Sequence, residues 1–155
     1  MSQLVFRHIR RFIRLSLLAI AVSVFAGCSN PRMIPPKIAA NDPNGNFHLY
    51  ISNQSFAVSL VDIKVFIDGK LVVNGSFEVG SQHNYQLFVL KLSSGRHKIV
   101  AESSKGHARL EQIFDVNDRP WATLTYWFYP KAEGGAKPCP PQFKFDLSKE
   151  PIYFM

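Results

Sequence analysis

The side chains that could do chemistry in this 155-residue chain are few and scattered. A zinc site needs three or four convergent His, Cys or carboxylate ligands. In a hairpin turning at residues 103–106, His107 would face Glu102 and His97 would lie near Gln112, so no such set forms. We therefore expect no metal site and no cofactor. The four histidines that follow residue 28 are His48, His83, His97 and His107.

The sequence gives equally little sign of a catalytic nucleophile. The Gly-x-Ser-x-Gly pattern is absent, and Ser93-Ser94 and Ser103-Ser104 fall in predicted turns, where serine hydroxyls bond the local backbone. Cys139 stands between prolines and cannot sit at a helix N-terminus, which closes that route to a reactive thiolate. It is either a free loop thiol or a partner for an intermolecular disulfide. The sequence thus predicts no catalytic residue and a protein that is not an enzyme.

The densest aromatic segment, residues 121–129, is the best candidate for binding. Strand alternation places Trp121, Trp127 and Tyr129 on one face and Ala122, Leu124, Tyr126 and Phe128 on the other. The second set suits a core. The first set could stack on sugar rings if it faces solvent. The alternative is a central strand with both faces covered.

The elements that must position these residues read as strands. No proline occurs from residue 44 to 119, which suits a sheet because proline cannot donate to a ladder. Val61, Ile63, Val65 and Ile67 alternate with polar or outward residues, and turns are predicted at Asp68-Gly69-Lys70 and Asn74-Gly75. We predict an all-β, antiparallel sandwich of about seven or eight strands, immunoglobulin-like or transthyretin-like, over residues 46–155. A Pro/Gly-rich loop at 130–141 precedes its last strand.

The N-terminal segment predicts export. Basic residues up to Arg14 precede an apolar run of 13 residues, 15–27. As a helix this run would span about 20 Å, short of the roughly 30 Å of bilayer hydrocarbon. Phe25-Ala26-Gly27-Cys28 resembles the lipobox of bacterial lipoproteins. That resemblance implies a signal peptide at 1–27 and lipidation of Cys28. With Ser29 after the cysteine, it also implies anchoring in the outer membrane of a Gram-negative envelope. The prolines, asparagines and glycine that follow predict a flexible tether at 28–45.

The net charge of +7 depends largely on this segment. Four of the 18 basic residues lie in 1–27, which holds no acidic residue, so 14 basic and 11 acidic residues remain after it. A balance of +3 gives little support to nucleic-acid binding, which depends on neutralising phosphates. We expect a membrane partner through the lipid anchor, and no nucleic acid.

The middle of the chain carries a second, shorter resemblance. A strand ending in Asp68-Gly69-Lys70, followed by Gly95-Arg96-His97, resembles PEGA-type small β modules of bacterial surface proteins. It implies a non-catalytic domain. We therefore expect an outer-membrane lipoprotein whose sandwich binds an envelope protein or glycan. One alternative is an assembly component of an envelope or secretion machine, by analogy with transthyretin-like lipoproteins of type VI secretion. The other is an envelope hydrolase.

Overall fold

A computed structural model describes residues 37–38, 41–81, 83–117, 120–132 and 137–154. These residues belong to one compact unit, Met33–Met155. They form nine strands and no helix, so this part of the chain contains no helix that is long and apolar enough to cross a membrane. The expected signal peptide, Cys28 and residues 29–36 of the tether lie outside the described residues.

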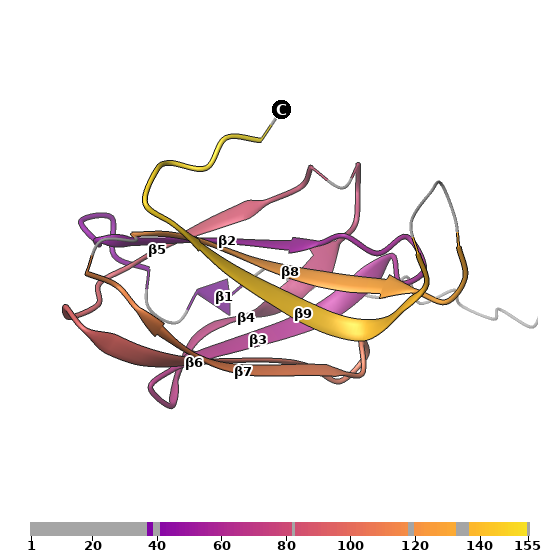
Figure 1. Ribbon diagram of the computed structural model, residues 1–155, viewed down its shortest axis with the longest axis horizontal. Helices are drawn as coiled ribbons and strands as arrows, with labels where there is room; N and C mark the ends of the chain where they lie inside the picture. The colour runs from indigo at the N-terminus through magenta and orange to yellow at the C-terminus, as the bar shows by residue number, and fades with distance from the viewer. Residues whose placement is uncertain (1–36, 39–40, 82, 118–119, 133–136, 155) are drawn as a thin grey trace, which may run out of the picture. The chain divides into compact units, whose positions relative to one another are not determined.

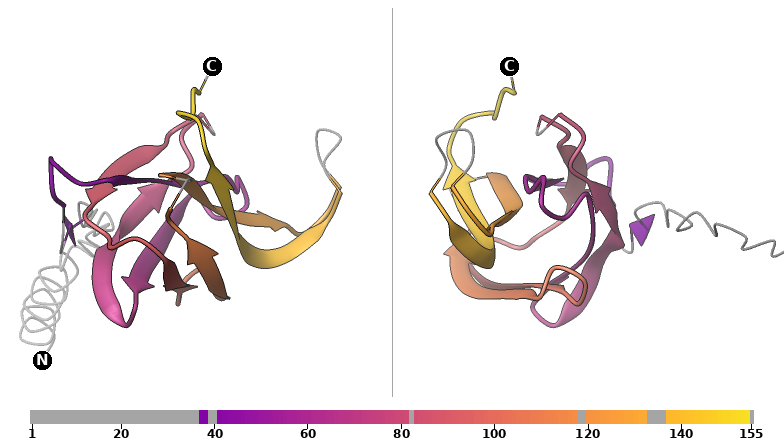
Figure 2. Two further views of the ribbon diagram at one scale, coloured as in Figure 1. Left: turned by 60° about the vertical axis from the view of Figure 1, so that its left-hand side comes forward. Right: turned by 90° about the vertical axis from the view of Figure 1, so that its right-hand side faces the viewer.

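The strands make two packed sheets (Figure 1; Figure 2). Sheet A has the order β1 (Lys37–Ile38), β4 (Lys70–Glu78), β3 (Leu60–Ile67), β6 (Arg96–Ser103), β7 (Ala108–Asp115). Sheet B has the order β5 (Gln86–Leu90), β2 (Phe47–Asn53), β8 (Trp121–Tyr129), β9 (Cys139–Ser148). Apart from the two-residue β1, each sheet has four strands, and the predicted β-sandwich is confirmed.

One strand pair differs from the expected antiparallel arrangement. β2 and β8 run parallel, with His48 opposite Trp121 and Asn53 opposite Tyr126. Counted from β2, the sheets have the orders 4-1-7-8 and 3-2-5-6. An immunoglobulin constant domain would instead group strands 1, 2, 5 and 4. The observed order therefore differs from that of an immunoglobulin constant domain.

The core forms where the alternation predicted it. Val61, Ile63 and Val65 are fully buried between the sheets, as are Ala122, Leu124 and Tyr126 of β8. The turn between β3 and β4 is also as predicted. Asp68 and Gly69 both have positive φ, 51° and 76°, the geometry of a two-residue hairpin whose twist matches its strands.

The second predicted turn is wrong. Asn74 and Gly75 lie inside β4, opposite Lys64 and Ile63 of β3, because a ladder of eight paired positions outweighs the local turn preference of Asn-Gly. The predicted histidine partners are also displaced. His97 faces Phe114 rather than lying near Gln112, and Glu102 faces Arg109 rather than His107.

Two predicted boundaries differ from the structure. The sandwich does not begin at residue 46, because Ile38 pairs with Val73 of β4 and the backbone N–H of Asp42 donates to the Val89 carbonyl of β5. Gly45 is needed on this path, since a Cβ there would collide with the Leu90 carbonyl. The loop predicted at 130–141 ends earlier, because β9 begins at Cys139. Pro140 and Pro141 are tolerated in β9 because β9 is an edge strand of sheet B.

Candidate functional site

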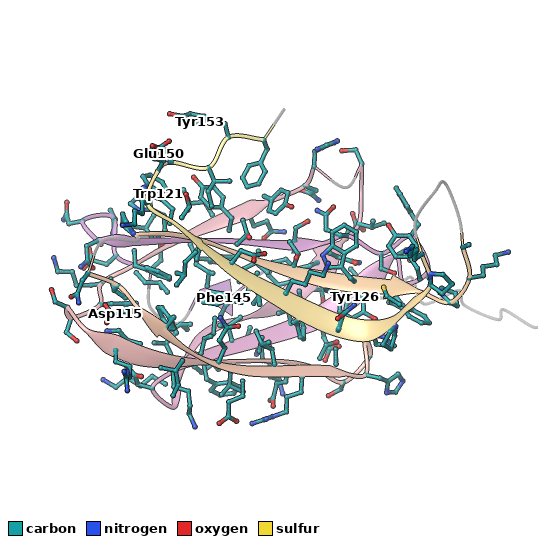
Figure 3. The ribbon with its side chains drawn as sticks, in the orientation of Figure 1. Asp115, Trp121, Tyr126, Phe145, Glu150 and Tyr153 are labelled. Carbon is teal, nitrogen blue, oxygen red and sulfur yellow. The ribbon has the colours of Figure 1, made fainter. Side chains whose placement is uncertain are left out.

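Strand β8 places the predicted aromatic residues away from the core. Trp121 and Trp127 are half-buried, whereas Tyr126 is fully buried against sheet A. In Figure 3, Tyr126 and Phe145 lie between the two sheets, and Trp121 lies beside the C-terminal segment that carries Glu150 and Tyr153. β8 is a central strand, as the alternative hypothesis held, and its outer face is covered in part: Trp121 and Trp127 each keep some of their surface in solvent.

Trp121 belongs to a continuous series of rings, which we call the aromatic row. Its indole stacks on His48 of β2 with ring centroids 4.1 Å apart and lies 6.4 Å from the ring of Tyr50. Tyr50 meets Phe154 edge-on at 5.1 Å, and Phe154 stacks on Tyr85 at 3.8 Å. Two strands, one loop and the C-terminal segment thus contribute rings to this row.

Polar groups border the aromatic row on β9. Ser148 lies opposite Trp121, and Asp146 lies opposite Thr123. These side chains point to the same outer face, because Leu147 and Phe145 alternate with them toward the core. Hydroxyl and carboxylate groups beside an aromatic surface are the combination that binds a sugar, whose ring offers both C–H faces and hydroxyl groups.

Trp127 and Tyr129 form a separate patch. Six residues of strand separate Trp127 from Trp121, about 20 Å. The indole N–H of Trp127 donates to Thr125 Oγ1 at 2.8 Å, and Lys144 Nζ lies 5.4 Å from the Trp127 ring. The Tyr129 hydroxyl donates to the Gln54 carbonyl at 3.1 Å. The three residues predicted as one site are therefore not brought together.

Four members of the aromatic row were missed from the sequence: His48, Tyr50, Tyr85 and Phe154. Alternation does assign His48 and Tyr50 to the outer face of their strand, which was the available signal. Nothing local indicated that β2 pairs directly with β8. Nδ1 of His48 is buried without a hydrogen-bond partner in the described part of the chain, and nothing in the structure explains it.

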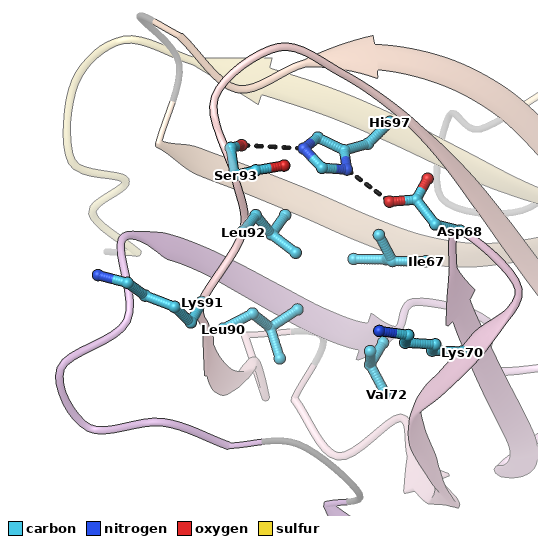
Figure 4. A pocket seen from close by; sticks show the side chains of 9 residues that line it. All are labelled: Ile67, Asp68, Lys70, Val72, Leu90, Lys91, Leu92, Ser93 and His97. Atoms are coloured by element: carbon cyan, nitrogen blue, oxygen red, sulfur yellow. Dashed lines mark hydrogen bonds and ion pairs between the residues drawn. The ribbon is translucent and has the colours of Figure 1, made fainter.

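A second cluster lies at the end of the sandwich where β3 turns into β4. His97 is 7% exposed, and its Nδ1 lies 2.6 Å from Asp68 Oδ2. Its Nε2 donates to the Ser93 carbonyl at 2.9 Å (Figure 4). The other carboxylate oxygen of Asp68 accepts the backbone N–H of Lys98 at 2.9 Å. The cluster ties the β3–β4 turn to β6.

These contacts set the protonation of the pair. Burial lowers the pKa of His97, but the hydrogen bonds to Asp68 and Ser93 and the charges of Asp68 and Asp115 outweigh it and raise the pKa above 6.5. The Lys98 N–H, together with His97, lowers the pKa of Asp68 below 3.8. Both ring nitrogens of His97 then act as donors, as in an imidazolium.

The cluster does not have the geometry of a nucleophilic triad. A serine hydroxyl would have to donate to a free imidazole lone pair. In this structure the group on Nε2 is a backbone carbonyl, which can only accept, so Nε2 carries a proton and has no lone pair to offer. No group of three potential metal ligands occurs among residues 41–154 that the structure describes.

Asp68 and His97 were noted in separate segments of the sequence, a turn and the start of a strand, and their contact was not predicted. Comparison with known proteins gives no further information about this pair. No family model matches the chain, and neither a curated protein nor a solved structure does.

Proposed function

We propose that this chain is a non-catalytic, lipid-anchored protein of the Gram-negative outer membrane whose sandwich binds an envelope glycan through the aromatic row. The observation that carries the proposal is the stacking of Trp121, His48 and Tyr50 on a partly exposed sheet face with Ser148 and Asp146 beside it. Buried aromatic side chains normally pack into a core. The five rings of the aromatic row gather instead on the outer face of sheet B, and we assign the binding surface to them.

A non-catalytic role is supported by the second cluster. The side chains nearest to a catalytic arrangement, Asp68 and His97, are fully occupied by each other and by backbone groups. Their role is to hold the turn between β3 and β4 against β6.

Binding to purified peptidoglycan sacculi and to N-acetylglucosamine oligomers tests the proposal. We expect Trp121→Ala to weaken binding about threefold to tenfold, the range of one aromatic contact. Its melting temperature should move little, because the indole is only half-buried. Ile113→Ala is the matched control, since Ile113 is an exposed apolar residue on sheet A.

Two results would contradict the assignment. Equal binding by wild-type protein and the Trp121 variant would remove the aromatic row from the function. Loss of binding in Trp127→Ala alone would move the site to the other end of β8.

The second candidate is an assembly component of an envelope machine. The β-sandwich architecture favours it, by analogy with transthyretin-like lipoproteins of type VI secretion alone. In vivo cross-linking distinguishes the two. A cross-linked complex of fixed size that Trp121→Ala abolishes, with no glycan binding by the wild type, would support assembly over glycan binding.

A further inference from the structure

A pocket of about 330 Å³ lies between the edges of the two sheets, where β4 of sheet A and the end of β5 of sheet B approach each other (Figure 4). Its walls are mainly apolar and come from Ile67, Val72, Leu90 and Leu92. The volume is at the lower end of the range of about 300–1,000 Å³ found for small-molecule sites. It suits one narrow apolar chain.

A β-bulge turns one of these walls toward the pocket. The register of β3 with β4 shifts so that Val65 pairs with Val73 while Phe66 pairs with Leu71. Val72 is therefore the additional residue, and Val72 and Val73 are buried one after the other. Strict alternation would have turned Val72 outward, so the bulge re-aims an apolar side chain at the pocket.

Two lysines, Lys70 and Lys91, are among the residues that line the pocket. Asp68 and His97 close one end, but each neutralises the other. Lys70 is exposed and forms no ion pair among residues 41–154 that the structure describes. In Figure 4 its ammonium group extends across the pocket toward Leu90, whereas Lys91 points away. Apolar walls with one ammonium group are complementary to an amphiphile that has an anionic head.

The pocket lies close to the strand at which the predicted tether meets the sandwich. The chain enters the sandwich at β1, and Ile38 pairs with Val73, the neighbour of the pocket residue Val72. If Cys28 is lipidated, only residues 29–36 separate the anchor from β1, a reach of at most about 30 Å. An anchor at Cys28 would therefore keep β1 within about 30 Å of the membrane.

We propose that this pocket binds the apolar chain of a fatty acid taken from the adjacent membrane, with the fatty-acid carboxylate paired with Lys70. This inference rests on the lipid anchoring in the proposed function but not on the aromatic row. It gives the protein a second ligand class at a site remote from Trp121.

Photo-cross-linking of the full lipid-anchored chain tests this proposal. The protein is reconstituted in phosphatidylcholine vesicles and exposed to decanoic acid with a diazirine at its chain end. We expect labelled residues, mapped by mass spectrometry, to cluster in 67–72 and 90–97. Lys70→Met should reduce labelling about twofold to fivefold, the effect of one partly exposed charge. Lys91→Met, the matched control, should label as the wild type does.

Two further comparisons make the test specific. The corresponding diazirine alcohol should label the pocket less than the acid, because it lacks the carboxylate. Leu92→Phe and Val72→Phe should each block labelling by filling the pocket from opposite walls, and resistance to protease shows which of them remains folded. Labelling spread over the surface, or a folded filled variant that labels like the wild type, would overturn the proposal.

The same variants separate this proposal from the function proposed above. Trp121→Ala should lose glycan binding and keep fatty-acid labelling, whereas a folded Leu92→Phe variant should do the opposite. Failure of one site therefore leaves the other intact and measurable.

Discussion

At the scale of residues, the most informative contact is the 2.6 Å pair of His97 and Asp68. The two residues are 29 positions apart, and each lies beside a turn. A charged pair with one buried partner stabilises the fold only while both groups are ionised. The pair therefore makes the stability of the protein depend on pH within a window that its two pKa values define.

The sign of that dependence follows from the shifts. Because the pKa of His97 is raised in the folded state, its contribution is complete below the unfolded value near 6.5 and is lost as the pH rises through the folded pKa. Because the pKa of Asp68 is lowered, its contribution is complete above 3.8 and is lost as the pH falls through its folded pKa. The pair thus stabilises the fold most between these two values.

We expect the free energy of unfolding to fall by about 1 kcal/mol or less as the pH rises above 6.5, since the Asp68 side chain is half-exposed and screened by solvent. Urea titrations at several pH values measure this free energy of unfolding. His97→Gln should flatten this dependence, whereas His83→Gln, an exposed control, should keep it. A wild-type stability that rises through this range would contradict the argument.

At the scale of elements, the segment after β9 covers part of the aromatic row. Ser148 Oγ and the backbone of Glu150 exchange hydrogen bonds of 2.8 Å and 3.1 Å, which turn the chain back. Phe154 then reaches Tyr85 and Tyr50. In Figure 1 this segment lies above sheet B, on the side away from sheet A. Its Phe154 occupies the end of the row that Tyr85 forms.

This packing predicts that Phe154→Ala uncovers Tyr50 and Tyr85. We expect a cost of about 0.5–1.5 kcal/mol in unfolding free energy for the lost ring contacts, and stronger quenching of tyrosine fluorescence by acrylamide. Tyr153→Ala should change neither quantity after correction for the lost tyrosine, because Tyr153 is 84% exposed. Identical quenching in wild-type protein and the Phe154 variant would show that the segment does not cover the row.

The covering segment also bears on glycan binding. If the ligand uses the whole aromatic row, Phe154→Ala should strengthen binding, because the ligand no longer competes with Phe154. If the ligand uses only Trp121 and His48, affinity should be unchanged. A decrease in affinity would instead make Phe154 part of the binding surface.

At the scale of the whole molecule, the proposed lipid anchor decides where the domain works. We expect the wild-type protein to fractionate with membranes and to partition into detergent. Its intact mass should correspond to residues 28–155 plus acyl chains. Two or more acyl chains make anchoring durable, at about 0.8 kcal/mol per buried methylene.

The Cys28→Ala variant tests the anchor directly. Lipidation precedes cleavage in lipoproteins, so this variant should remain an uncleaved precursor. Cys139→Ala is the matched control and should be processed normally. Normal cleavage of the Cys28 variant would contradict the lipoprotein proposal.

The sequence alone determined the properties that a single strand carries. Alternation placed Tyr126 in the core and Trp121 on the outer face, and Asp68-Gly69 set the turn between β3 and β4. These predictions succeeded because side-chain direction has a period of two along any strand, whichever strand lies beside it. The same local reasoning failed at Asn74-Gly75, where a ladder to β3 holds the chain extended.

Only the tertiary structure decided which strands are neighbours. The parallel pairing of β2 with β8 brings His48 beside Trp121, and the packing of Phe154 on Tyr85 completes the aromatic row. The attachment of residues 41–46 to β5 converts part of the predicted tether into the domain. These outcomes depend on contacts between residues far apart in the chain, whose energies compete across the whole fold. No local pattern in the sequence predicts the outcome of that competition.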